Sequence, residues 1–209
     1  MPIYALPEAI TYFLIWIDAI KLQAKIRPGL AMDIRFDIKG DRHAAKVVDD
    51  FLAADKLITG EADWVWYDQS AEYRRTYVVT VDGIPTGATL ELIAYPMLQE
   101  QKIYPFTITL NFPPCVERLE VLPSSGGHTN PFKEYSDYDQ VIRGSHYHGW
   151  EDNKYLAKAN DLPKELDIAR VLPVEIKAFD SATRWFCQRT NIIIEKHQYL
   201  ELPPRSWLL

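Results

Sequence analysis

Cysteine is scarce in this sequence. The 209 residues contain two cysteines, Cys115 and Cys187, which lie far apart and form no C-x-x-C pair. Two isolated cysteines are typical of reduced thiols in a reducing compartment rather than of disulfide-bonded proteins. We therefore predict a cytoplasmic protein whose thiols are buried and unreactive.

Long apolar runs are also missing. The longest run, residues 9–17, is followed by Asp18 and Lys21 and is too short to span a bilayer. No basic residue precedes this run, although a secretory signal would require one. We predict that the protein has no membrane anchor and no membrane partner.

The chain has no excess of positive charge. Its net charge is −6 and its pI is near 5.4. Such a chain has no overall field that attracts nucleic acid, so contact with RNA or DNA would need a local basic patch. The charge lowers the expectation of a nuclease without excluding one.

Signatures of several enzyme classes are absent as well. We find no serine nucleophile elbow, P-loop, Rossmann glycine fingerprint, H-E-x-x-H or EF-hand spacing. Kinase chemistry and cofactor-dependent redox chemistry therefore have no support. We expect no cofactor, except that the histidines described below could bind a divalent metal.

The apolar content is sufficient for a folded core. With 47% apolar and 12% aromatic residues, the chain fits one domain, residues 1–209. We divide it into a helical part (1–60), a sheet (61–150), and a C-terminal helix with a tail (151–209). The predicted fold class is α+β: an antiparallel meander of about five to six strands, with two N-terminal helices and one C-terminal helix packed on it.

Helical periodicity marks the two N-terminal helices. The first begins near Pro7 and stops at residues 27–29, and the second runs from Asp41 to Gly60. The first helix is apolar on two sides, so it lies either in the core or against a second subunit. Together with the apolar, proline-containing tail (200–209), which docks on the body or on a partner, it is the candidate surface of a homodimer.

Period-two alternation begins at Asp63 and predicts strands. A helix opened by Pro173 follows the sheet. The strand segments are residues 64–67, 74–81, 88–93, 105–112 and 116–121, with a short last strand at 145–148.

Two of the five histidines, His146 and His148, are two residues apart in the predicted last strand, which puts both side chains on one face. Histidine titrates near neutral pH and is the commonest metal ligand, so such a pair suits proton transfer or metal binding. His128, in the glycine-rich loop 124–131, could complete a trio. The alternative is a pair on the solvent face of an edge strand with no chemical role.

Arg118 and Glu120 share one face of the predicted strand 116–121. If this strand lies beside the histidine strand, Arg118 would bind an anion and Glu120 would act as a general base or as the partner of an imidazole. An ordinary ion pair on a solvated face is the alternative. The candidate substrate-binding residues are Asn130, Tyr147 and Trp150.

Three short motifs resemble those of a known family: R-L-E at 118–120, H-T-N-P at 128–131 and H-Y-H at 146–148. Their order is similar to that in an uncharacterised family of small bacterial and phage-borne, toxin-like proteins with an R-[LV]-D strand, an H-x-N-P loop and an H-x-H strand. The resemblance covers about residues 103–195, and Glu120 stands where the family has Asp. It matches the three histidines and Asn130 to motif positions and implies a toxin-like role without naming a substrate.

Three functions are open on these residues. The first is a toxin-like phosphodiesterase or nuclease in which His146 and His148 act as general acid and base, while Arg118 stabilises phosphate charge and His128 positions the phosphate. The second is a non-catalytic interaction protein, a mobile-element or defence accessory factor, whose histidines are structural. The third is a metal site of the three histidines that serves hydrolysis or structure.

Overall fold

The computed structural model describes residues 42–207, with gaps at 61–62, 97–103, 113, 124, 132–136, 157–161, 164, 174–175, 177, 196–197, 199 and 205–206. The described helices are α2 (Arg42–Ala53), α3 (Trp150–Asn153) and α4 (Phe179–Arg189). In the described part of the chain, none of them has the length and apolar character needed to cross a membrane. The strands are β1 (Lys56–Thr59), β2 (Val65–Tyr67), β3 (Glu72–Val81), β4 (Ile84–Ala94), β5 (Phe106–Asn111), β6 (Cys115–Val121), β7 (Gly127–Thr129), β8 (Val141–Arg143), β9 (His146–His148), β10 (Arg170–Val171) and β11 (Ile192–Ile193).

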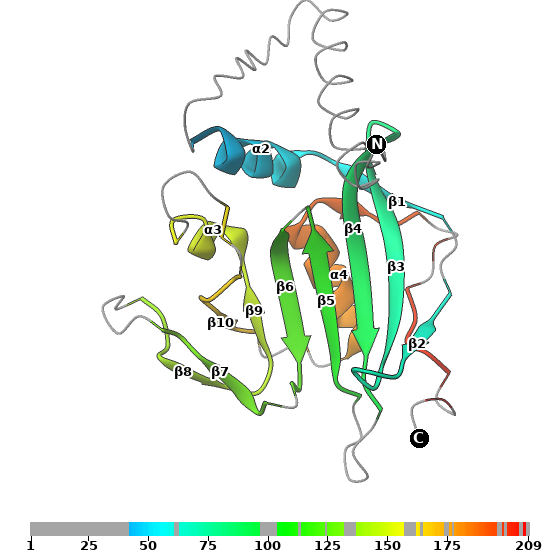
Figure 1. The fold of residues 1–209 in the computed structure, drawn as a ribbon, viewed down its shortest axis with the longest axis vertical. Coiled ribbons are helices and arrows are strands. Elements are labelled where there is room, and N and C mark those ends of the chain that lie inside the picture. The colour runs from blue at the N-terminus through cyan, green and yellow to red at the C-terminus, as the bar shows by residue number, and fades with distance from the viewer. Residues whose placement is uncertain are drawn as a thin grey trace, which may run out of the picture.

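One large sheet dominates the fold (Figure 1). It contains nine strands in the order β10-β9-β6-β5-β4-β3-β1-β11, with β2 paired to β3. Strands β3 to β6 form an antiparallel meander, whereas β1 and β11 pair in parallel, so the sheet is mixed. Strands β7 and β8 form a separate hairpin, which lies next to the β9–β10 edge of the large sheet.

The core lies mainly between the sheet and α4, which covers one face of the sheet (Figure 1). Phe179 of α4 contacts Phe106 with ring centroids 5.0 Å apart. At the end of the sheet, Phe51 of α2 stacks on Phe112 at 4.1 Å. Burial of each such side chain contributes roughly 1.5–3 kcal/mol, so this packing holds the strands that carry the site. The fully buried aliphatic residues of β4 and β5 are Leu90, Leu92, Ile108 and Leu110.

The predicted fold class is wrong in both its sheet and its helices. The sheet is a mixed one of nine strands rather than a meander of five to six, and α2 is the one helix that precedes it among the described residues. The predicted first helix, which begins near Pro7, lies outside the described residues. The second helix is shorter than predicted, because α2 ends at Ala53 and residues 56–59 form β1. Two-residue strands such as β10 and β11 are too short to produce a periodic pattern.

Lys56 explains the early end of α2. Its side chain is fully buried, and its ammonium donates to the carbonyls of Phe51 and Leu52, with N–O distances of 2.6 and 3.1 Å. These are carbonyls of the last turn, which have no partner within the helix. The chain then continues as β1, in which Leu57 and Ile58 pair with β11 and β3. Leu57 fits a helical face as well as a strand, so periodicity alone could not separate the two.

The C-terminal tail packs on its own chain in the described residues. The indole N–H of Trp64 donates to the carbonyl of Glu201 at 3.2 Å, and the ring of Trp207 lies 5.7 Å from the ring of Tyr73. The tail therefore follows β2 and β3. The homodimer stays a prediction.

Candidate metal centre

Strand pairing brings the predicted motifs together. In the antiparallel pair of β6 and β9, Arg118 lies opposite His148 and Glu120 lies opposite His146. Side chains of opposed residues lie on the same face of a sheet and contact each other. The four side chains therefore form one group, in which His146 is 1% exposed and His148 is fully buried.

The group lies on the face of the sheet opposite to α4. Tyr147, between the two histidines, contacts Trp185 of α4 with ring centroids 5.0 Å apart. Glu117, beside Arg118, pairs with Arg189 of the same helix. Because successive residues of a strand point to opposite faces, His146, His148 and Arg118 point away from α4.

The third imidazole comes from the β7–β8 hairpin. The ring centroid of His128 lies 5.5 Å from that of His146 and 4.7 Å from that of His148. One ring nitrogen from each histidine can be chosen so that all three lie within 4.8 Å of one another. Gly127 permits the close pairing of β7 with β8 in this hairpin, because at its φ of +154° a Cβ atom would lie 2.1 Å from the carbonyl oxygen of Ile142 on β8.

Hydrogen bonds to the backbone orient two of the rings. Nε2 of His128 lies 2.8 Å from the carbonyl oxygen of Asp167, and Nδ1 of His146 lies 2.9 Å from that of Gly144. A carbonyl only accepts, so each of these nitrogens carries the proton, and the other nitrogen of each ring keeps its lone pair. Metal-ligating histidines are held in this way, by a carbonyl on the nitrogen that does not bind the metal.

Arg118 fixes the tautomer of the His148 ring. Its Nη2 lies 3.1 Å from Nε2 of His148. A guanidinium only donates, so Nε2 accepts and the proton of this ring is on Nδ1. Nδ1 itself is buried and has no hydrogen-bond partner among the described residues. In their neutral form all three imidazoles thus have one nitrogen without a proton, and that of His148 accepts from Arg118.

Burial lowers the pKa of two of the imidazoles, those of His146 and His148, and so keeps them neutral. It lowers the pKa of His148 to about 2, with the positive charge of Arg118 acting in the same direction. Burial also lowers the pKa of His146, despite the hydrogen bond to Gly144 and the charge of Glu120. Neutral imidazole is the form that binds a metal, whereas a general acid must hold a proton.

Glu120 adds a carboxylate to the group. Its Oε1 lies 2.9 Å from Nε of Arg118 in an ion pair, while its oxygens lie 3.7 Å from Nε2 of His146 and 3.8 Å from Nε2 of His148. Ligand atoms at ~2.1 Å from a tetrahedral zinc ion lie ~3.4 Å apart. The three imidazole nitrogens, which lie within 4.8 Å of one another, are therefore up to ~1.4 Å farther apart than in a loaded site. Both side chains are partly exposed, Arg118 at 32% and Glu120 at 21%, so the charged side of the group faces solvent.

The predicted substrate-binding residues have other contacts. Tyr147 faces α4, as described above, and Trp150 is fully buried, with its indole N–H donating to Asp49 at 2.8 Å. Asn130 is buried too, and its amide pairs with the backbone of Ala169. A role for these three residues in substrate binding stays a prediction.

The carbonyls that orient the rings had no signal in the sequence. Gly144 and Asp167 act through their backbones, which every residue type possesses, so no residue pattern could have revealed them. Of the two cysteines, Cys187 is buried and Cys115 is half-buried. Burial raises the pKa of Cys115 to about 11 and that of Cys187 to about 12, so neither is the thiolate that nucleophilic chemistry requires.

Comparisons of the chain with protein-family models, with curated proteins and with solved structures found no match. Nothing in them bears on the family that the three motifs resemble, and that resemblance stays a prediction. Any functional argument therefore rests on the chemistry of the site.

Proposed function

We propose that the protein binds a divalent transition metal, with zinc as the simplest candidate, through His128, His146 and His148, and that it hydrolyses an anionic ester of the phosphodiester type. One observation carries the proposal: three imidazoles converge, so that one ring nitrogen from each lies within 4.8 Å of the other two. Imidazole ligands suit zinc, copper, iron and nickel, and three protein ligands with an open position are typical of catalytic zinc sites.

The pKa of His148 favours the metal over a metal-free mechanism. A pKa of about 2 leaves this ring unprotonated at neutral pH, so it has no proton to donate as a general acid. The same property suits a ligand, because no proton competes with the metal for Nε2. When bound, such a metal supplies Lewis acidity to a phosphoryl oxygen and acidifies water.

Arg118 and Glu120 supply the remaining roles. Arg118 presently donates to Nε2 of His148, the atom that a metal would need, so it must turn away when the metal binds. Being 32% exposed, the guanidinium has room to turn towards solvent, where it can hold a phosphoryl oxygen with paired N–H groups. Glu120, next to the imidazole nitrogens, is then the base that accepts a proton from the attacking water.

Metal content tests the binding step. Protein purified without a histidine tag and incubated with zinc should hold about one equivalent after gel filtration, whereas His146→Ala and His148→Ala should hold much less. Cys187→Ala is the matched control, because Cys187 is a possible metal ligand that lies on α4 and is not a member of the cluster, and it should bind like the wild type. Zinc contents near zero for wild-type protein would overturn the proposal.

Hydrolysis tests the catalytic step. A chromogenic phosphodiester, RNA and single-stranded DNA are incubated with the zinc-loaded wild type, with chelator-treated protein and with His146→Ala. We expect turnover by the loaded wild type alone. Equal activity in all three samples would overturn the catalytic assignment. Binding of zinc without turnover of any of the three substrates would leave the non-catalytic alternative, in which the metal has a structural role.

A further inference from the structure

The backbone carbonyl that orients the His128 ring lies in a segment without regular structure. The carbonyl of Asp167 accepts from Nε2 of His128 at 2.8 Å. Asp167 lies in the segment 166–169, which belongs to no helix or strand. A segment without a hydrogen-bond ladder needs other contacts to hold its carbonyls in place.

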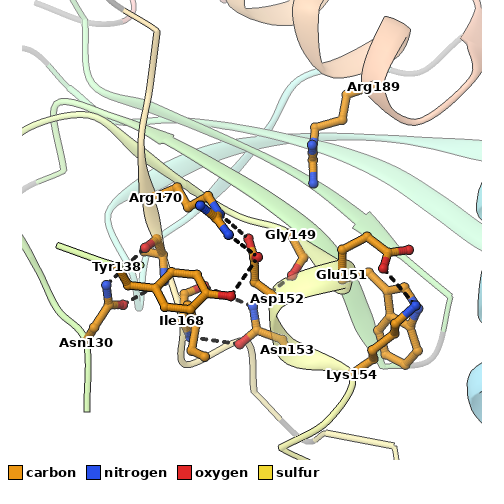
Figure 2. A network of polar contacts seen from close by, with 12 residues as sticks. Asn130, Tyr138, Gly149, Glu151, Asp152, Asn153, Lys154, Ile168, Arg170 and Arg189 are labelled. Carbon is orange, nitrogen blue, oxygen red and sulfur yellow. Dashed lines mark hydrogen bonds and ion pairs between the residues drawn. The ribbon is translucent and has the colours of Figure 1, made fainter. Parts of the chain in front are cut away.

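Two asparagine side chains provide these contacts. Asn153 donates to the carbonyl of Ile168 at 2.9 Å and accepts from its N–H at 2.7 Å. Asn130 does the same with Ala169, at 3.0 and 2.7 Å. Each amide thus pairs with the N–H and the C=O of one residue, as a neighbouring strand would. Figure 2 shows both asparagines at this segment.

The remaining N–H groups of the two amides are also used. Asn130 donates to the carbonyl of Asp139 at 2.6 Å, and Asn153 donates to that of Gly149 at 2.8 Å. Asn153 is fully buried and Asn130 is 3% exposed. Groups that are buried and fully hydrogen-bonded hold a single geometry, because any rotation would leave polar atoms unpaired.

Each asparagine is also close in sequence to one of the histidines. Asn130 follows His128 by two residues, at the end of β7, and Asn153 lies on α3, which begins two residues after His148. The far end of the segment is held by Arg170, which forms two hydrogen bonds of 2.8 Å with Asp152 of α3 (Figure 2). The segment is therefore fixed to the same local units that carry the two rings.

We propose that Asn130 and Asn153 are positioning residues of the histidine centre. By fixing residues 166–169, they hold the carbonyl of Asp167 against the ring N–H group of His128. This selects the tautomer of the His128 ring and presents its opposite nitrogen to the metal. The expected effect on metal affinity rests on the proposed metal site, whereas the expected effect on the His128 tautomer concerns the metal-free protein. Removing partners of this kind lowers metal affinity by about 10–100-fold.

The test measures tautomers and metal affinity in separate experiments. Nitrogen-15 NMR of the histidine rings in metal-free protein reports which nitrogen holds the proton, and titration with cobalt(II), followed by absorbance, gives the affinity. We expect the wild type to show the proton on Nε2 of His128. In Asn130→Ala and Asn153→Ala, this ring should become a tautomer mixture, and the cobalt dissociation constant should rise by at least about tenfold.

Thr190→Ala is the matched control for lost stability. Thr190 is fully buried and donates to the carbonyl of Phe186 at 2.8 Å, at the end of α4 and on the other face of the sheet. This variant should keep the His128 tautomer and the cobalt affinity of the wild type. If an alanine variant does not fold, Asn130→Ser and Asn153→Ser, which keep one hydrogen-bonding group, are measured in the same way.

The outcomes separate the two proposals. Unchanged tautomers and unchanged cobalt affinity in folded asparagine variants would overturn the positioning role. A second outcome is an altered His128 tautomer in the asparagine variants with no cobalt binding by any protein, wild type included. It would uphold the role of residues 166–169 in orienting the His128 ring and would overturn the metal site.

Discussion

The two faces of β6 carry two Arg–Glu pairs with opposite properties. On the face towards α4, Glu117 is 4% exposed, accepts from Arg189 at 2.9 Å and accepts from the backbone N–H of Trp150 at 3.0 Å. On the other face, Glu120 is 21% exposed and shares its carboxylate between Arg118 and two imidazoles at 3.7–3.8 Å. The carboxylate of Glu117 thus accepts hydrogen bonds from groups that the fold holds in place, whereas the partly exposed carboxylate of Glu120 can still interact with a ligand.

Residue type alone does not distinguish the structural carboxylate of Glu117 from the candidate functional carboxylate of Glu120 on this strand. Glu117 and Glu120 lie three residues apart on one strand, and both carboxylates have a guanidinium partner, Arg189 on α4 for Glu117 and Arg118 on β6 for Glu120. The difference lies in solvent access and in what else contacts the carboxylate. A buried, fully paired carboxylate stabilises the fold and cannot exchange partners, while a partly exposed one can.

The largest effect should come from Glu117→Ala. This change leaves Arg189 and the N–H of Trp150 without their acceptor at the contact between α4, α3 and the sheet. Breaking a buried pair from one side costs about 3 kcal/mol of unfolding free energy. Urea unfolding measures the loss, and zinc stoichiometry at low temperature should stay near that of the wild type. A loss below about 1 kcal/mol would remove the distinction between the two faces.

Glu120→Gln should lower activity strongly and stability only slightly. The amide keeps the shape of the side chain but loses the basic carboxylate, so hydrolysis by the zinc-loaded protein should fall about 100-fold. The unfolding free energy should change by less than about 1 kcal/mol, because this pair is partly exposed. Initial rates and urea curves of the same preparation provide both values. Full activity in this variant would exclude Glu120 as the base.

Acid should destabilise the protein through His148. Its folded-state pKa is about 2 against 6.5 for the free side chain, so the unfolded chain takes up a proton that the folded chain cannot. The stabilising contribution is fully present above pH 6.5 and is lost as the pH falls below it, by about 1.4 kcal/mol for each pH unit well below 6.5.

The variant His148→Gln isolates this contribution. The variant retains the groups that face the ring, namely Arg118, Glu120, His128 and His146, and removes only the imidazole of His148. Urea unfolding at pH 7.5 and pH 5.5 should show a smaller acid loss in the variant than in the wild type. The same pH dependence in both proteins would contradict a neutral, buried His148.

The smallest effect is expected for Arg118→Gln. Removing the guanidinium frees Nε2 of His148 and takes a positive charge away from the centre, so zinc should bind several-fold more tightly. The same change should weaken binding of an anionic substrate, which is visible as a higher KM. Isothermal titration with zinc and steady-state kinetics measure the two changes. Weaker zinc binding in the variant would indicate that Arg118 supports the metal site rather than competing with it.

The sequence allowed part of this site to be predicted, and the limits have physical causes. The shared face of His146 and His148, and that of Arg118 and Glu120, follow from the two-residue period of a strand. The strands of the central meander were recognisable for the same reason. The nine-stranded sheet was not, because β1, β10 and β11 have two to four residues each and are defined by pairing with distant segments.

By itself, then, the sequence determined which side chains share a face, because the geometry of one strand is local. Contacts between distant segments appear only in the tertiary structure. These are the register that places Arg118 opposite His148, the hairpin that adds His128, and the segment 166–169 that orients the His128 ring. Register and docking depend on how buried surfaces fit together across the sheet, and no pattern within a single segment contains that information.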